Sequence, residues 1–285
     1  MTSQIKTLLL LSLLTGLIML MGGAVGGQSG LIVAFGFALI MNIGSYWFSD
    51  KVVLSMYSAK ELQPADAPMI HKMAEELSAN AGIPKPRLYM VPDDAPNAFA
   101  TGRNPEHAVV AVTRGIVRLL SPEELRGVLA HEIAHVAHRD ILIQSVAGVL
   151  ASVIMFMANM ARFAGMFGGR NRQGGGNPLA GLLMAILAPL AAMLIQMAIS
   201  RSREYLADAG GAKYSGQPQA LASALGKLQS YSRKIPMRTG SDSTAHLCIV
   251  NPFSGGGISS LFSTHPSTEE RIKRLLAVKF QNKLD

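Results

Sequence analysis

The chain has 285 residues, of which 49% are hydrophobic and only 15% are charged. Soluble domains carry about 25% charged residues, so this composition favours an integral membrane protein over an ordinary soluble one. The net charge of +8 does not indicate nucleic-acid binding, because residues 50–140 hold 10 basic and 12 acidic residues and no basic run with interleaved aromatics occurs. The single cysteine, Cys248, excludes an intrachain disulfide and fits a reducing compartment.

Two long apolar segments open the chain. Residues 7–25 and 29–49 contain no charged side chain, and each has about the 20 residues that a helix needs to cross a bilayer. A cleaved signal peptide is the alternative for the first segment. Its apolar stretch exceeds the roughly 7–15 residues of such peptides, and a second apolar segment follows almost at once. We therefore predict an N-terminal transmembrane hairpin over residues 1–49.

The next block, residues 50–140, has the pattern of an α+β unit. Apolar residues recur at helical spacing in its first part, and short β-rich runs separated by Asp, Pro, Gly and Asn turns follow. A Ser-Pro-Glu-Glu capping box then opens a second helix. We expect a three-stranded sheet beside that helix. The predicted elements are a helix over Ala65–Ala81, strands at Arg87–Val91, Asn97–Thr101 and Ala108–Val112, and the capped helix over 122–139.

The capped helix carries the motif His131-Glu132-Ile133-Ala134-His135. Two imidazoles four residues apart lie on one helical face, where both can bind a single Zn²⁺. Neutral imidazoles leave the charge of the ion intact, which lowers the pKa of a bound water, and a neighbouring carboxylate such as Glu132 can then accept the proton. The alternative is a surface helix with incidental histidines. The helix start just upstream favours the metal site, and with it hydrolysis of amide bonds.

Two more apolar segments, residues 141–161 and 178–200, separate this motif from the last polar block. Gln144, Asn159 and Gln196 make these segments more polar than the first pair. They therefore either span the membrane, dip into it, pack on the soluble domain or line a wet cleft. With them the chain has about four hydrophobic segments. The basic excess after residue 200 places both polar blocks in the cytoplasm by the positive-inside rule.

The last block supplies candidates for a third ligand. Glu204 and Asp208 are four residues apart and share one helical face. By themselves they would be interpreted as a solvated charged face. A catalytic zinc ion is bound by three protein ligands and keeps one open position, however. We therefore favour Glu204 as the third ligand and Asp208 as a hydrogen-bond acceptor that orients an imidazole. His138 is a competing ligand, but it lies two helical turns from His131.

Four motifs together resemble the HtpX family of bacterial membrane proteases, relatives of the CaaX prenyl protease. The resemblance covers nearly the whole chain, including the apolar segments on either side of the zinc motif. The motifs are Asn97-Ala98-Phe99-Ala100-Thr101-Gly102, His131-Glu132-Ile133-Ala134-His135 with Arg139-Asp140, Ser202-Arg203-Glu204-Tyr205-Leu206-Ala207-Asp208, and His265-Pro266.

This resemblance implies a zinc metallopeptidase of the gluzincin type, with one Zn²⁺ per chain, in the bacterial inner membrane. It implies a mainly α fold with a small β-sheet, that is, an α+β zincin-like catalytic domain, and substrates that are unfolded or damaged membrane proteins. Our expected division is 1–49, 50–140, 141–200 and 201–285. The implied roles are metal ligands His131, His135 and Glu204, general base Glu132, a substrate-binding edge strand Asn97, Ala98, Phe99 and Ala100, and an oxyanion donor His265.

Two alternatives stay open at this point. From spacing alone, His265 is a polar loop residue rather than a donor. A membrane-bound zinc protein that binds unfolded chains without cutting them would need the two histidines but not Glu132, so that residue distinguishes a protease from a binding protein.

Overall fold

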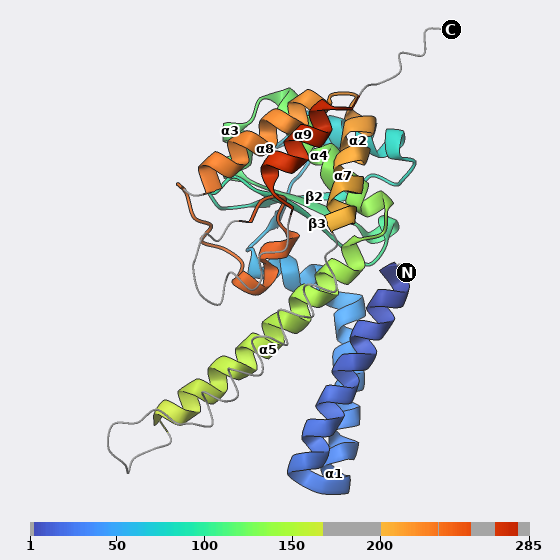
Figure 1. Ribbon diagram of the computed structural model, residues 1–285, viewed down its shortest axis with the longest axis vertical. Coiled ribbons are helices and arrows are strands. Elements are labelled where there is room, and N and C mark those ends of the chain that lie inside the picture. The colour runs from blue at the N-terminus through green and yellow to red at the C-terminus, as the bar shows by residue number, and fades with distance from the viewer. Residues whose placement is uncertain (1–2, 168–200, 233, 252–265, 279–285) are drawn as a thin grey trace.

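The computed structural model describes residues 3–167, 201–232, 234–251 and 266–278. Its first helix, α1 (Ser3–Met56), folds back on itself at Gly27, whose φ of 56° suits a residue without a Cβ. The two arms run antiparallel as a helical hairpin (Figure 1), and Asn42 Nδ2 donates a hydrogen bond to Thr15 Oγ1 across it at 2.8 Å. The second arm continues beyond residue 49 as far as Met56.

A mixed four-stranded sheet lies in the body of the molecule. Its order is β1-β2-β4-β3, with β2 and β4 parallel and the two outer pairs antiparallel. The expectation of three strands was therefore wrong by one, because a strand of two exposed residues carries no alternation that a sequence pattern can reveal. The strands are β1 (Lys60–Glu61), β2 (Arg87–Val91), β3 (Ala98–Thr101) and β4 (Val109–Thr113).

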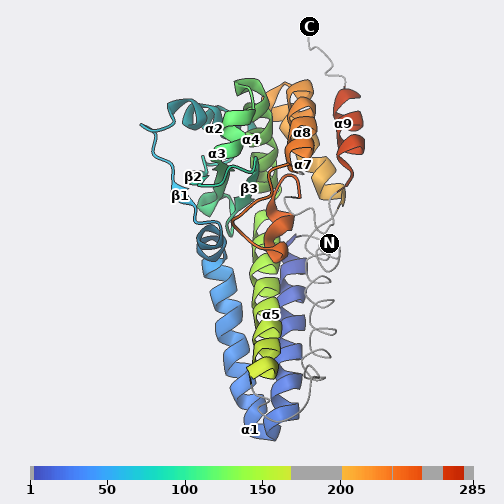
Figure 2. The same cartoon turned by 90° about the vertical axis from the view of Figure 1, so that its left-hand side faces the viewer.

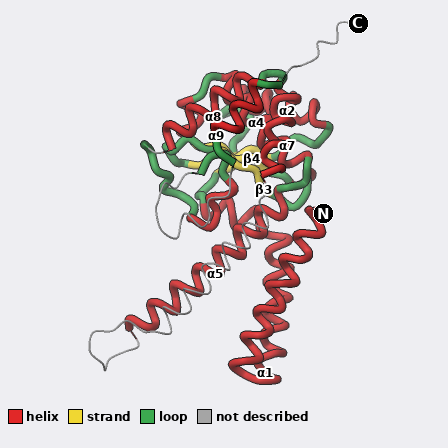
Figure 3. Tube along the Cα trace, viewed as in Figure 1, coloured by secondary structure: helices red, strands yellow, loops and turns green. Residues whose placement is uncertain are grey.

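Helices lie around this sheet (Figure 3), and α4 (Pro122–Ala137) buries twelve of its sixteen residues. Its predicted capping box is present: Ser121 Oγ accepts from Glu124 N at 3.3 Å, and Glu124 Oε2 accepts from Ser121 N at 2.9 Å. The other elements of the body are α2 (Pro68–Ala81), η1 (Pro105–His107), α3 (Arg114–Leu119), α7 (Arg201–Ser215), α8 (Pro218–Ser232), η2 (Asp242–Leu247) and α9 (Thr268–Leu276).

A sharp bend joins α4 to the apolar helix α5 (Ile141–Phe167). The two helices meet at 90°, and Arg139 between them has the left-handed φ of 58°. Near the body, α5 packs on the first arm of α1, where Leu10, Ile143 and Ala147 share one buried cluster. The α1 hairpin and α5 leave the body on the same side (Figure 2), so the apolar helices form one end of the molecule.

One described helix, Gly27–Met56, is by itself long and apolar enough to cross a membrane. In the first arm the apolar helix is shorter, Thr7–Leu20. The apolar helix α5 is long and apolar enough to cross a membrane only when it is counted together with α4, across the bend. The fourth predicted segment, 178–200, lies outside the described residues. The expectation of four hydrophobic segments is thus confirmed for one of them, and the mainly helical fold with a small sheet is confirmed.

Candidate metal centre

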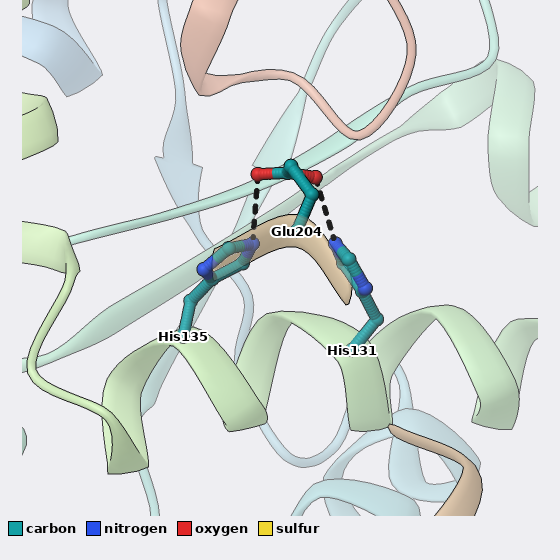
Figure 4. Close-up of side chains that lie close together, drawn as sticks. All are labelled: His131, His135 and Glu204. Atoms are coloured by element: carbon teal, nitrogen blue, oxygen red, sulfur yellow. Dashed lines mark ion pairs between the residues drawn. The ribbon is translucent and has the colours of Figure 1, made fainter. Parts of the chain in front are cut away.

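His131 and His135 project from one face of α4 toward Glu204 of α7 (Figure 4). His131 Nε2 lies 3.8 Å from Glu204 Oε2, and His135 Nε2 lies 3.5 Å from Glu204 Oε1. Bonds of about 2.1 Å to one tetrahedral zinc ion would hold two ligand atoms about 3.4 Å apart. All three residues are buried, and one ligand atom from each lies within 4.8 Å of the others. The donor set therefore fits a single metal ion.

Close packing of α7 on α4 brings Glu204 to this point. Gly211 of α7 lies directly against the backbone of α4, since a Cβ added there would be 3.1 Å from both Cα and N of His131. A Cβ on Gly210 would be only 2.7 Å from the Cβ of Ala134. The two glycines thus allow the helix axes to approach, nearly two turns beyond Glu204.

A carboxylate faces the second nitrogen of each imidazole. Asp208 Oδ1 lies 3.0 Å from His131 Nδ1, and Asp140 Oδ2 lies 3.6 Å from His135 Nδ1. A carboxylate at Nδ1 favours the tautomer that presents Nε2 as the free ligand atom. Asp208 occupies the place that the sequence predicted for it. Asp140, which is in turn 3.3 Å from Arg203 Nη1, was not assigned a role from the sequence.

Arg271 of α9 is the functional candidate that sequence reasoning missed. Its guanidinium donates to both carboxylate oxygens of Asp208, at 2.9 and 2.8 Å, and it lies 3.8 Å from Glu204 Oε2. It is 1% exposed, the largest fully buried side chain in the described part of the chain. The one available signal was that Arg271 lies four residues before Leu275, on the same face of an amphipathic helix. Arginine is almost never buried without a partner, however, and the partner of Arg271 lies 63 residues upstream, where no local pattern reveals it.

Glu132 lies next to His131 on α4 but points to the sheet. Its carboxylate accepts a hydrogen bond from the backbone N–H of Ala100 in β3. Oxygen Oε1 of Glu132 has no hydrogen-bond partner among the described residues. A buried carboxylate with one oxygen anchored and one available is suited to accept a proton from a group entering the site.

The predicted substrate strand does lie at an edge of the sheet. Among the described strands, β3 pairs only with β4, and its other side faces the metal centre through Ala100. Part of this edge is covered by the chain itself, because Ile249 N donates to Ala98 O at 3.0 Å and Asn97 Nδ2 donates to Val250 O at 2.8 Å. Because the N–H of Ala100 already bonds to Glu132, the group of this edge that no other described residue covers is the carbonyl of Ala100. The side chain of Phe99 is fully buried, so only backbone groups of this strand are offered.

The ionisation of these groups follows from burial and from their neighbours. Burial lowers the pKa of His131 to about 4 and raises the pKa of Glu132 to about 7. Burial also opposes the charged form of His135, but the carboxylates of Glu204 and Asp140 outweigh it and raise that pKa to about 9. Arg271 likewise overcomes the burial of Asp208 and holds the pKa of that carboxyl well below its usual range.

The structure thus brings most of the predicted site residues together: the three candidate ligands, Glu132, Asp208 and the strand beginning at Ala98. His138, the rival ligand, is exposed one residue past the end of α4 and takes no part in the cluster. His265 lies outside the described residues.

Comparison with known proteins gives the chain its family. The family profile described as Peptidase family M48 matches residues 64–279, which is more than half of the chain and includes every candidate metal ligand. The chain belongs to peptidase family M48. Within M48, the protein named "Protease HtpX homolog" from Syntrophobacter fumaroxidans is 58% identical over 96% of this chain and 99% of its own length. The protein of the same name from Persephonella marina is 57% identical over 95% and 96%.

Among solved structures, the crystal structure of S. mikatae Ste24p has the same fold. The TM-score is 0.51 with 20% sequence identity, and the match covers 95% of this chain but 65% of Ste24p. That likeness supports the arrangement of elements only. The M48 family and its HtpX homologues identify a metal-dependent peptidase, and the apolar helix Gly27–Met56 makes it a membrane-bound one.

Proposed function

We propose that the chain is a zinc-dependent endopeptidase of the gluzincin type. The observation that carries this proposal is the convergence of His131, His135 and Glu204 from two helices on one buried point, with Glu132 beside them. Two nitrogen ligands and one carboxylate are a common donor set of catalytic zinc, and they leave a fourth position open. One Zn²⁺ per chain follows from the single cluster found among the described residues.

Zinc bound by these residues would supply a Lewis acid that polarises the scissile carbonyl and lowers the pKa of water. The protein supplies the proton transfers. Glu132 accepts the proton of the attacking water at its available oxygen, Oε1, and then passes it to the departing amine. Asp208 and Asp140 hold the two imidazoles in place at their Nδ1 atoms. We assign to His265 the role of a donor to the developing oxyanion, on the resemblance alone.

The substrate in this proposal is an extended polypeptide. It would add to the open edge of β3 at Ala100 by main-chain hydrogen bonds, which recognise a backbone rather than a sequence. Such pairing suits unfolded or damaged chains. Because the α1 hairpin and α5 start directly below the site, we propose that damaged proteins of the bacterial inner membrane are its substrates, with the catalytic body in the cytoplasm.

A comparison of Glu132→Gln with Glu204→Gln tests this function. Each protein is purified in detergent with chelator, given zinc, and assayed for bound zinc and for cleavage of labelled casein. We expect Glu132→Gln to keep about one zinc while activity falls roughly 10²–10⁴-fold, which is the usual contribution of a general base. Glu204→Gln should lose both zinc and activity. Glu123→Gln, an exposed change on the same helix, serves as the control and should lose neither.

Two results would contradict the proposal. Zinc-dependent cleavage that survives Glu132→Gln would remove Glu132 from the mechanism. A parent protein that binds zinc and unfolded casein but never cuts it would instead support the non-catalytic binding protein.

A further inference from the structure

A cavity of about 390 Å³ lies where the α1 hairpin meets the catalytic body, and we call it the interfacial cavity. It is separate from the metal centre, and four elements contribute to it: both arms of α1, the loop after β3, and the bend between α4 and α5. The lining residues that matter here are Leu8, Leu11, Tyr46, Arg103, Asn104 and Arg139.

Two arginines give the interfacial cavity its charge. The guanidinium of Arg103 lies 4.8 Å from the ring centroid of Trp47, and Arg139 projects from the bend with an exposed side chain. Neither has a carboxylate within 4.0 Å in the described part of the chain. Two guanidinium groups without an acidic partner on one cavity favour an anion, and their planar forks match phosphate oxygens best.

The surroundings identify the depth of this cavity in the membrane. Tyr46, Trp47 and Phe48 are exposed on the second arm, about two to three turns before α1 ends at Met56, and Trp47 lies beside Arg103 of the body. Exposed Tyr and Trp at the end of an apolar helix mark the headgroup level of a bilayer. The apolar side chains of Leu8 and Leu11 bound the cavity at this level, because the pairing of Thr15 with Asn42 sets Leu11 opposite Tyr46. Leu13, which is 42% exposed, continues the apolar surface of the first arm below it. A free phosphate ion needs no apolar wall, whereas a phospholipid offers a phosphate and acyl chains together.

We propose that the interfacial cavity binds the phosphate group of an anionic phospholipid through Arg103 and Arg139, with its acyl chains along the first arm of α1. Basic pockets between membrane helices on the cytoplasmic side are suited to such headgroups. The bound lipid would contact the α4–α5 bend at the residue before Asp140, whose carboxylate faces His135. It would thereby fix the catalytic body at the membrane surface.

Trp47 is the single tryptophan of the chain and supplies a direct signal. The full chain in mild detergent is titrated with brominated phosphatidylglycerol or brominated phosphatidylcholine, and quenching of Trp47 fluorescence is measured. We expect the parent to bind phosphatidylglycerol more tightly than phosphatidylcholine, as measured by quenching at lower lipid concentration. Arg103→Gln and Arg139→Gln should each lower that preference about fivefold, as expected for about 1 kcal/mol per basic residue near a lipid surface.

The control is Arg118→Gln, which removes the same charge on α3, away from the α1 hairpin. It should keep the parent's preference, and equal melting temperatures in lipid-free detergent show that all variants are folded. Equal quenching by both lipids in the parent, or an equal loss in Arg118→Gln, would overturn the proposal. Displacement of the lipid by millimolar inorganic phosphate would also overturn it, because the ligand would then be a free anion.

Discussion

At the scale of single residues, the metal centre consists of buried carboxylates whose negative charges are compensated by buried cations. Glu204, Asp208 and Asp140 are all at least 95% buried, and such carboxylates persist only beside cations. Arg271 and Arg203 provide two of these cations from residues that bind no metal. The geometry of the candidate ligands therefore depends on arginines whose partners are far away in the sequence.

The first prediction concerns Arg271. Arg271→Met keeps the length of the side chain but leaves Asp208 and Glu204 without their shared cation, so unfolding of the zinc-free protein should become easier by about 3–5 kcal/mol. The control is Arg274→Met on the same helix, an exposed residue paired with Glu270, which should change stability little. Thermal and denaturant unfolding in detergent measure both. An Arg271→Met variant as stable as the control would show that the buried pair is not needed.

The second prediction is that zinc binding depends on pH. Because the pKa of His135 is raised to about 9, its imidazole is protonated at pH 7 in the metal-free protein and must lose that proton to bind zinc. Affinity should therefore fall about tenfold for each pH unit below 9. His131, with a pKa of about 4, is already neutral and adds nothing to this slope. Competition with a chelator of known pH dependence measures the zinc affinity at each pH.

Asp140→Asn supplies the matched test of this cause. It removes one of the carboxylates that raise the pKa of His135, so the decline in affinity should begin at a lower pH. Zinc affinity that is constant between pH 7 and 9 in the parent would contradict the assignment.

At the scale of elements, helix contacts decide whether the ligands meet. The sequence predicted α4 to within two residues at its end, since the capping box and the apolar face are local signals. It could not predict how closely α7 approaches α4, which depends on Gly210 and Gly211 facing a particular turn. It also missed β1 and the buried position of Arg271, because both depend on partners distant in the sequence.

The third prediction tests this helix contact. Gly211→Ala introduces a methyl group 3.1 Å from the backbone of His131, so α7 must shift and carry Glu204 away from the histidines. Zinc affinity should drop even though no ligand is changed. Gly226→Ala in α8 is the control, because its Cβ would meet only Ile272 at an ordinary 3.8 Å, and alanine favours a helix. Equal zinc affinity in both variants would show that α7 tolerates the displacement.

The fourth prediction concerns the edge strand. In an extended peptide paired with β3, the N–H groups of alternate residues point to the strand and those between point away. N-methylation of a peptide substrate should therefore raise KM at one residue and leave it nearly unchanged at the next. A series of peptides methylated at successive positions on either side of the cleaved bond measures this. The absence of any alternation would exclude strand addition as the mode of binding.

At the scale of the whole molecule, the direction of the apolar helices determines on which side of the membrane the catalytic body lies. Composition and hydropathy predicted a membrane protein, and the α1 hairpin places both ends of its arms at the body and Gly27 at the far tip (Figure 1). The second arm of 30 residues is about 45 Å long, enough to cross a hydrocarbon core of about 30 Å. What hydropathy cannot reveal is the 90° bend at Arg139, because a backbone turn of three residues leaves no pattern in the apolar residues on either side.

The last prediction follows from this arrangement. With the catalytic body in the cytoplasm, the tip of the hairpin must face the opposite side. A cysteine at Gln28, next to the tip, should react with a membrane-impermeant maleimide in intact spheroplasts. A cysteine at the exposed Glu106, in the body, should react only after the membrane is broken. The native Cys248 is fully buried and contributes little background, and Cys248→Ser removes what remains. Labelling of Glu106→Cys from outside would reverse the orientation, and the site would then act on polypeptides of the other compartment.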